Sequence, residues 1–127
     1  MRTLSLAAAA LAAVLLLLPT AGRAAPPPVN LQARTAGDLA DLCAASPEEA
    51  LGAVRAGFCH GFAQGAIDDA FRRSGDKKPF CFPTPTPSRN ATLAEFVTWV
   101  RAQPERRSLP ALSALFQFMA ERFPCKS

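Results

Sequence analysis

Residues 57–71, GFCHGFAQGAIDDAF, contain the feature that decides the fold. Three glycines recur at every fourth position, Gly57, Gly61 and Gly65. This spacing places them on one face of a helix, although each glycine costs roughly 1 kcal/mol of helix propensity relative to alanine. We therefore interpret the stretch as part of the central helix of a small bundle, with the glycine face packed closely against a neighbouring helix.

The helix that carries these glycines is predicted to run from Pro47 to about Arg73. Ser46 is a suitable N-cap, Pro47 suits the first helical turn, and Glu49 completes a capping box. Gly75 is suited to cap the C-terminal end. The same helix carries an apolar stripe at Leu51, Val54, Phe58, Phe62, Ala66 and Ala70.

Three further helices are predicted, which makes the fold class all-α, a small four-helix bundle stapled by disulfides. The first helix covers residues 35–45 and starts with a capping box of Thr35 and Asp38. The third is capped by Thr92 and the fourth by Ser108. Prolines follow both of these helices, and four prolines in residues 76–90 exclude a helix from that connection.

The first 24 residues have the pattern of a secretory signal peptide. A positive start precedes the apolar run Leu4–Leu18, and a small-residue cleavage site follows, which we place after Ala24. The run is short for a membrane span, which needs ~20 residues, so an uncleaved anchor is the weaker alternative. The mature chain is then predicted to be a flexible Pro-rich tail, residues 25–34, followed by a helical domain, residues 35–127.

Charge argues against a nucleic-acid partner. The formal net charge is +4 for the whole chain, and two of the arginines leave with the signal peptide. The remaining cations form no long basic run, so nucleic-acid binding is not expected. The predicted location is the periplasm, without membrane association after cleavage.

Four cysteines in a small exported domain predict two disulfides. A short link makes the third and fourth helices an antiparallel hairpin, which brings Cys81 and Cys125 to the same side. Cys43 is then left to pair with Cys59. A tight turn at Ser46 would separate that pair, so the first helix must cross the second obliquely or the second must start later. Without a C-x-x-C pair, a zinc site is the weaker alternative.

Side chains in a catalytic arrangement are hard to find. His60 directly follows Cys59, and neighbours on a helix diverge by about 100°, which is unsuitable for a nucleophile and its base. Asp68 and Asp69 diverge in the same way. The sequence therefore predicts a binding protein that is not an enzyme, with no cofactor and no metal.

Short motifs in a fixed order extend from Thr35 to Cys125. They are TAGDL at 35–39, LC at 42–43, C-x-G-F-x-x-G at 59–65 with Asp68 after it, FCFP at 80–83, TLAEF at 92–96, QPER at 103–106 and FPC at 123–125. This ordered set resembles the Rap/Tai family of immunity proteins of type VI secretion systems. Two departures are Phe62, where members often carry Tyr, and the polar segment 64–66.

The resemblance implies a small helical periplasmic protein that binds a peptidoglycan amidase toxin and blocks its active-site cleft. It also implies a homodimer. The alternative comes from another class, a periplasmic stress or chaperone-like helical binding protein without a toxin partner. Such a protein would expose apolar surface in acid, and one histidine offers little acid sensitivity.

A toxin-binding surface is expected to protrude and to carry polar and aromatic anchors. The candidate lies at the end of the second helix and in the connection after it, at Arg72, Arg73, Asp76, Lys77 and Lys78. A solvated loop is the alternative for this segment. Trp99, at the edge of the third helix's apolar stripe, is a further candidate, although a half-buried core aromatic is the simpler interpretation.

Overall fold

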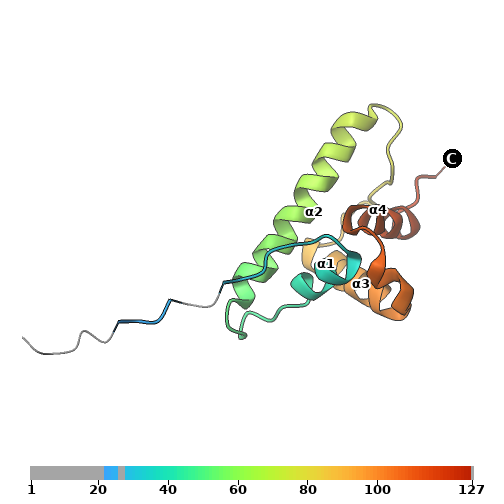
Figure 1. Cartoon of the computed structure of the whole chain (residues 1–127). Coiled ribbons are helices and arrows are strands. Elements are labelled where there is room, and N and C mark those ends of the chain that lie inside the picture. Colours follow the sequence, from blue (N-terminus) through green and yellow to red (C-terminus); the bar gives the residue numbers. More distant parts are fainter. Residues whose placement is uncertain (1–21, 26–27, 127) are drawn as a thin grey trace, which may run out of the picture.

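The computed structural model describes residues 22–25 and 28–126, so almost all of the predicted signal peptide lies outside it. The described residues form α1 (Ala36–Cys43), α2 (Gly52–Ser74), α3 (Arg89–Ala102), the 3-10 helix η2 (Pro104–Ser108) and α4 (Ala111–Arg122), shown in Figure 1. The predicted all-α fold class is confirmed. None of these helices is long and apolar enough to cross a membrane.

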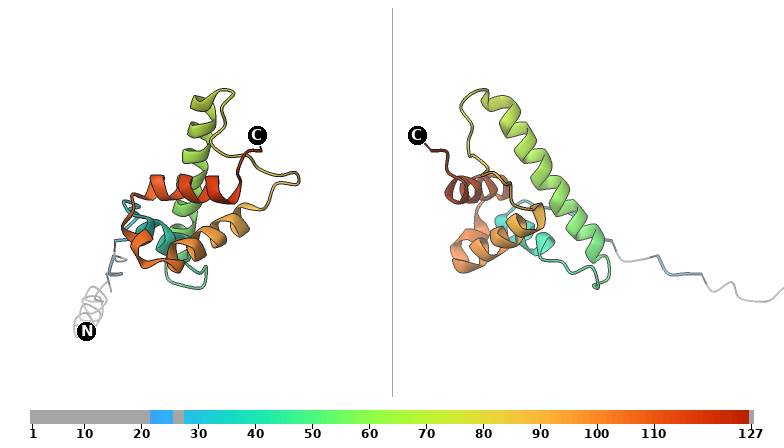
Figure 2. Two further views of the ribbon diagram at one scale, coloured as in Figure 1. Left: turned by 90° about the vertical axis from the view of Figure 1, so that its right-hand side faces the viewer. Right: turned by 180° about the vertical axis from the view of Figure 1, so that it is seen from behind.

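The shortest α-helix, α1, lies at the centre of the fold. It contacts α2, α3, η2 and α4, and its Leu39 and Ala40 side chains are completely buried. By contrast, α2 lies along one side of the other helices and projects beyond them at its C-terminal end (Figures 1 and 2). The central role predicted for residues 57–71 is therefore wrong, since Cys59 and Ala63 are the only buried residues in that stretch.

The capping box predicted at the start of α1 is confirmed. The Thr35 hydroxyl accepts a hydrogen bond from the Asp38 amide at 3.1 Å, and the Asp38 carboxylate accepts one from the Thr35 amide at 3.0 Å. The bond from the Thr35 amide is the main reason that the pKa of Asp38 lies below its usual value. The predicted flexible tail also has a packed part, because Leu31 and Ala33 are half-buried against the core.

Helix α2 begins at Gly52, later than the predicted cap at Ser46 implies. Two turns connect Ser46 to the start of α2. The Glu49 amide donates to the Ser46 carbonyl at 3.0 Å, and the Gly52 amide donates to the Glu49 carbonyl at 2.9 Å. The late start places Cys59 beside Cys43, with their Cα atoms 5.1 Å apart. The conflict between the predicted cap and the predicted disulfide is thus resolved in favour of the disulfide.

The last two helices also begin at residues other than those predicted. Helix α3 begins at Arg89, capped by Ser88, and the Thr92 hydroxyl donates to the Ser88 carbonyl within the first turn. Helix α4 begins at Ala111, because the segment containing Ser108 is wound into η2. For α3 the Ser88 side chain is the cap, since its hydroxyl accepts from the Ala91 amide at 3.2 Å, whereas Pro110 precedes α4 without a side-chain cap.

Both predicted disulfides, Cys43–Cys59 and Cys81–Cys125, are present. The second joins the segment after α2 to the end of α4, where the Cys81 amide also donates to the Phe123 carbonyl at 2.8 Å. Together the two bridges hold the proline-rich segment and the start of α2 against the core.

The glycine face of α2 is open. Gly57, Gly61 and Gly65 are all exposed, and a Cβ atom added at any of them would have no neighbouring atom within 4 Å. The prediction that these glycines pack against another helix is therefore wrong. Helix α2 faces the rest of the fold with the side that carries Cys59 and Ala63, which leaves the glycines on the outer side.

Replacing Gly61 with alanine is expected to stabilise the protein by about 1 kcal/mol, because alanine has the higher helix propensity and meets no neighbour. Gly52→Ala is the matched control on the same helix. Its Cβ would collide with the Ser46 carbonyl, so we expect a loss of about 1–3 kcal/mol. Urea denaturation measures both changes, and a destabilised Gly61→Ala would show that this face is packed in solution.

Candidate functional site

Five of the six predicted partner-binding residues lie together at the projecting end of α2 and in the loop that follows. We call residues 72–78 the α2 tip. Arg72, Arg73, Asp76, Lys77 and Lys78 are all exposed. Gly75 caps the end of α2, and its φ of 54° turns the chain back toward the core, a conformation that glycine adopts readily. The tip therefore projects beyond the other helices (Figure 1).

The α2 tip carries an excess of positive charge. Asp69, one turn below it, accepts hydrogen bonds from Arg72, at 2.8 Å, and from Arg73. The bond from Arg72 is the first cause of the lowered pKa of Asp69. Among the described residues, no carboxylate forms an ion pair with Lys77 or Lys78. The two lysines thus offer the unneutralised charge of the tip.

Aromatic packing holds the tip to the body of the protein. The Phe71 ring meets the Phe80 ring edge-on, with centroids 5.0 Å apart, and the Lys78 ammonium lies 5.3 Å from the Phe71 centroid. Phe80 is completely buried, and Cys81 beside it is bridged to Cys125. These contacts make the tip a braced projection, a form that suits recognition of a concave surface.

Trp99 lies apart from the α2 tip, on α3. The Arg106 guanidinium stacks on its ring at 3.9 Å, and its indole N–H donates to the Glu121 carboxylate at 2.7 Å. The rings of Phe96 and Phe118 lie 6.4 and 6.0 Å away. This half-buried tryptophan therefore joins α3, η2 and α4, and the structure does not group it with the other predicted partner-binding residues.

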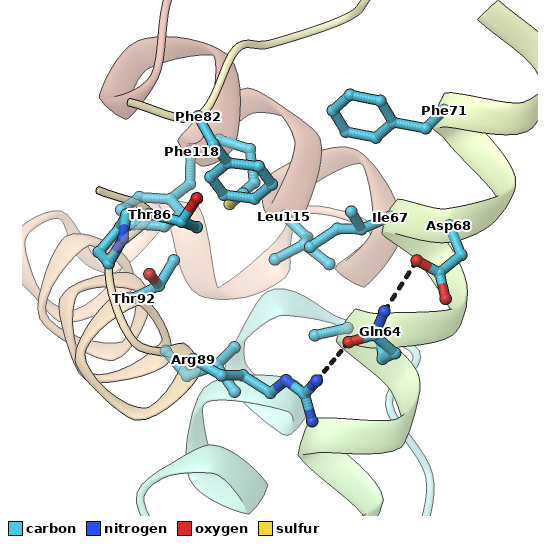
Figure 3. Close-up of a pocket in the computed structure, with 14 residues that line it drawn as sticks. Gln64, Ile67, Asp68, Phe71, Phe82, Thr86, Arg89, Thr92, Leu115 and Phe118 are labelled. Atoms are coloured by element: carbon cyan, nitrogen blue, oxygen red, sulfur yellow. Dashed lines mark hydrogen bonds between the residues drawn. The ribbon is translucent and has the colours of Figure 1, made fainter. Parts of the chain in front are cut away.

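A cleft of about 430 Å³ separates the middle of α2 from α3 and α4, and the sequence did not indicate it. Its walls are α2 from Ala63 to Phe71 and the extended segment 82–87, while α3 and α4 provide the floor with Leu93, Leu115 and other apolar residues. Figure 3 shows these side chains converging from four separate segments. The one signal in the sequence is the polar segment 64–66, which interrupts an apolar helix.

A chain of polar groups crosses the rim of this cleft. The Arg89 guanidinium donates to the Gln64 amide oxygen at 2.5 Å, and the Gln64 amide nitrogen donates to the Asp68 carboxylate at 2.8 Å, as the dashed lines in Figure 3 show. Arg89 and Asp68 are exposed, and Gln64 is half-buried. The rim therefore places one cation and one carboxylate on either side of a neutral amide.

The residues around His60 form no nucleophile and base pair. The sulfur atom of Cys59 is bonded to Cys43, so it is not available as a thiolate. His60 itself is half-buried on α2. Asp68 and Asp69 have separate partners, Gln64 for the first and two arginines for the second. The described residues contain no group of three or more His, Cys, Asp or Glu side chains placed to hold a metal ion.

Comparison with known proteins gives one family. The model of a family described as Rap1a immunity proteins matches residues 35–125. This range begins at the N-cap of α1 and ends at the last cysteine, so it includes all helices of the structure. No curated protein and no solved structure matches the chain.

Proposed function

This chain belongs to the Rap1a family of immunity proteins, and from that membership we propose that it binds and inhibits a peptidoglycan amidase toxin of a type VI secretion system. The partner of an immunity protein is a toxin, and its action is binding rather than catalysis. The family match over the whole helical domain carries this proposal. Three finer claims of the proposal are to be tested by experiment: that the toxin is an amidase, that it belongs to a type VI secretion system, and that the immunity protein is a homodimer.

Cysteine usage supports a periplasmic location for this activity. All four cysteines are bonded in two disulfides, and such bonds persist in oxidising compartments that include the bacterial periplasm. The apolar N-terminal segment has the pattern of an export signal. A peptidoglycan-cleaving toxin acts in the same compartment, so inhibitor and target would meet there.

We propose that the α2 tip enters the active-site cleft of the toxin. The tip is braced, projects from the body and presents two unneutralised lysines, and a convex, preorganised segment complements an enzyme cleft. Complementary charge mainly raises the association rate and sets specificity. The toxin surface around the cleft is therefore expected to be acidic.

Charge reversal tests this surface. Lys77→Glu with Lys78→Glu is expected to weaken toxin binding by at least about tenfold, because attraction becomes repulsion at a charged interface. The assay uses amidase effectors encoded beside this gene, with the dissociation constant measured on purified proteins and protection measured by survival of cells that export the toxin.

The matched control reverses two exposed cations elsewhere, Arg34→Glu with Arg101→Glu. It should bind as the unchanged protein does. Full binding by the lysine variant would exclude the α2 tip as the interface while leaving the immunity role intact. If neighbouring amidases are neither bound nor inhibited by the unchanged protein, the amidase role itself is wrong. Sedimentation of the free protein tests the homodimer.

A further inference from the structure

We propose that the cleft between α2 and the α3–α4 floor binds a free apolar α-amino acid, with the ligand's carboxylate on Arg89 and its ammonium group on Asp68. This inference goes beyond the proposed immunity role and does not depend on a toxin. It rests on three features of the cleft: contacts that border its two ends, an apolar interior and a rim with opposite charges.

The cleft is limited at both ends. The Arg89–Gln64 hydrogen bond closes one end by joining α3 to α2. At the other end the rings of Phe71 and Phe82 are stacked with centroids 6.3 Å apart. The cleft is open to solvent along its rim, and its volume of about 430 Å³ lies in the range of small-molecule sites, ~300–1,000 Å³. A ligand that fills the cleft is therefore small.

The interior suits an apolar side chain. Ile67 lines the α2 wall, and Leu115 and Phe118 rise from the floor (Figure 3). Leu115 and Phe118 are already almost completely buried in the core, so the floor is firm. A branched aliphatic or aromatic group placed here would remove apolar surface from water, both its own and that of the cleft. This is favourable in proportion to the apolar area covered.

The rim selects the ligand's charged groups. Arg89 and Asp68 each bind the neutral amide of Gln64, and among the described residues neither forms an ion pair. A guanidinium pairs best with a carboxylate, and a carboxylate pairs best with a cation. A free α-amino acid carries both groups next to its side chain. In a longer peptide the two charged ends lie one or more residues apart.

Chemical-shift titration of the oxidised ¹⁵N-labelled protein with L-phenylalanine tests the proposal. The expected shifts are in Gln64, Ile67, Asp68 and Arg89. Phenylalanine amide, which lacks the carboxylate, and N-acetylphenylalanine, which lacks the ammonium, should each bind about tenfold more weakly, the factor that 1.4 kcal/mol corresponds to. Glycine, which lacks the apolar group, and the peptide Gly-Gly-Phe should cause no shifts in the cleft.

Two variants test which side chain binds each charged group of the ligand. Arg89→Gln should abolish the preference for phenylalanine over its amide, and Asp68→Asn should abolish the preference over N-acetylphenylalanine. Arg101→Gln, on the same helix, and Asp76→Asn are controls that should keep both preferences. Equal binding of all three phenylalanine compounds by the unchanged protein, or no binding of any, would overturn the proposal, and so would tighter binding of the peptide. Thermal denaturation confirms that each variant is folded.

Discussion

Replacing Phe80 with alanine is expected to lower the free energy of unfolding by about 3–5 kcal/mol, the usual loss for a buried phenylalanine. Phe80 belongs to an irregular, proline-rich segment, and yet its side chain has no exposed surface. Its ring contacts those of Phe71 and Phe82, with centroids 5.0 and 5.6 Å away. The variant would lose both the burial and the link between the end of α2 and the core.

Phe58→Ala is the matched control for this prediction. Phe58 lies on α2, is half-buried, and has one aromatic neighbour, Phe62, at 6.4 Å. Its replacement should cost clearly less than that of Phe80, because less apolar surface returns to water. Urea denaturation of both variants gives the comparison. Equal losses would contradict the assignment of Phe80 as the residue that anchors the segment.

Removing the Cys81–Cys125 disulfide is expected to cost about 4 kcal/mol, and removing Cys43–Cys59 about 3 kcal/mol, from the chain entropy of the loops that they close. The two bridges span 44 and 16 residues of sequence. The proteins to compare are the double alanine variants at each pair, unfolded in urea without reductant. The variant without Cys81–Cys125 should unfold at the lower midpoint concentration of urea.

The two bridges also differ in what they position. Cys81–Cys125 holds the segment behind the α2 tip, so its loss should weaken toxin binding as well as stability. Cys43–Cys59 joins the start of α2 to α1, and its loss should leave the tip contacts of Phe71 and Phe80 in place. Unchanged toxin binding after removal of Cys81–Cys125 would show that the aromatic contacts alone keep the tip in position.

Several features of the fold could be predicted from local sequence. The Thr35–Asp38 capping box works because both partners lie within one turn. Gly75 ends α2 because the left-handed backbone at that point favours glycine. Counting cysteines and following the chain reversal between α3 and α4 led to both disulfides. Each of these inferences needs only neighbouring residues or the order of elements along the chain.

The errors have a common physical origin. Glycines four residues apart must share a helix face, but whether another helix packs on that face depends on residues elsewhere. Here the bond of Cys59 to Cys43 of α1 places the opposite face of α2 against the core, so the glycines face solvent. Ser46 and Thr92 are good caps in isolation, yet α2 begins at Gly52 and α3 at Arg89. Local capping is worth only about 1 kcal/mol, less than a disulfide or a buried aromatic residue.

The sequence alone determined an all-α domain with two specified disulfides and a basic segment at the end of its longest helix. Only the tertiary structure decided that the short α1 is the core, that the glycine face is open and that a cleft with a charged rim lies under α2. Gln64, Arg89 and Leu115 are distant along the chain and line one cleft because α2 is held by the disulfide at Cys59 and by the contact of Phe71 with Phe80. Helical periodicity describes one element at a time, whereas a cleft is a relation between several.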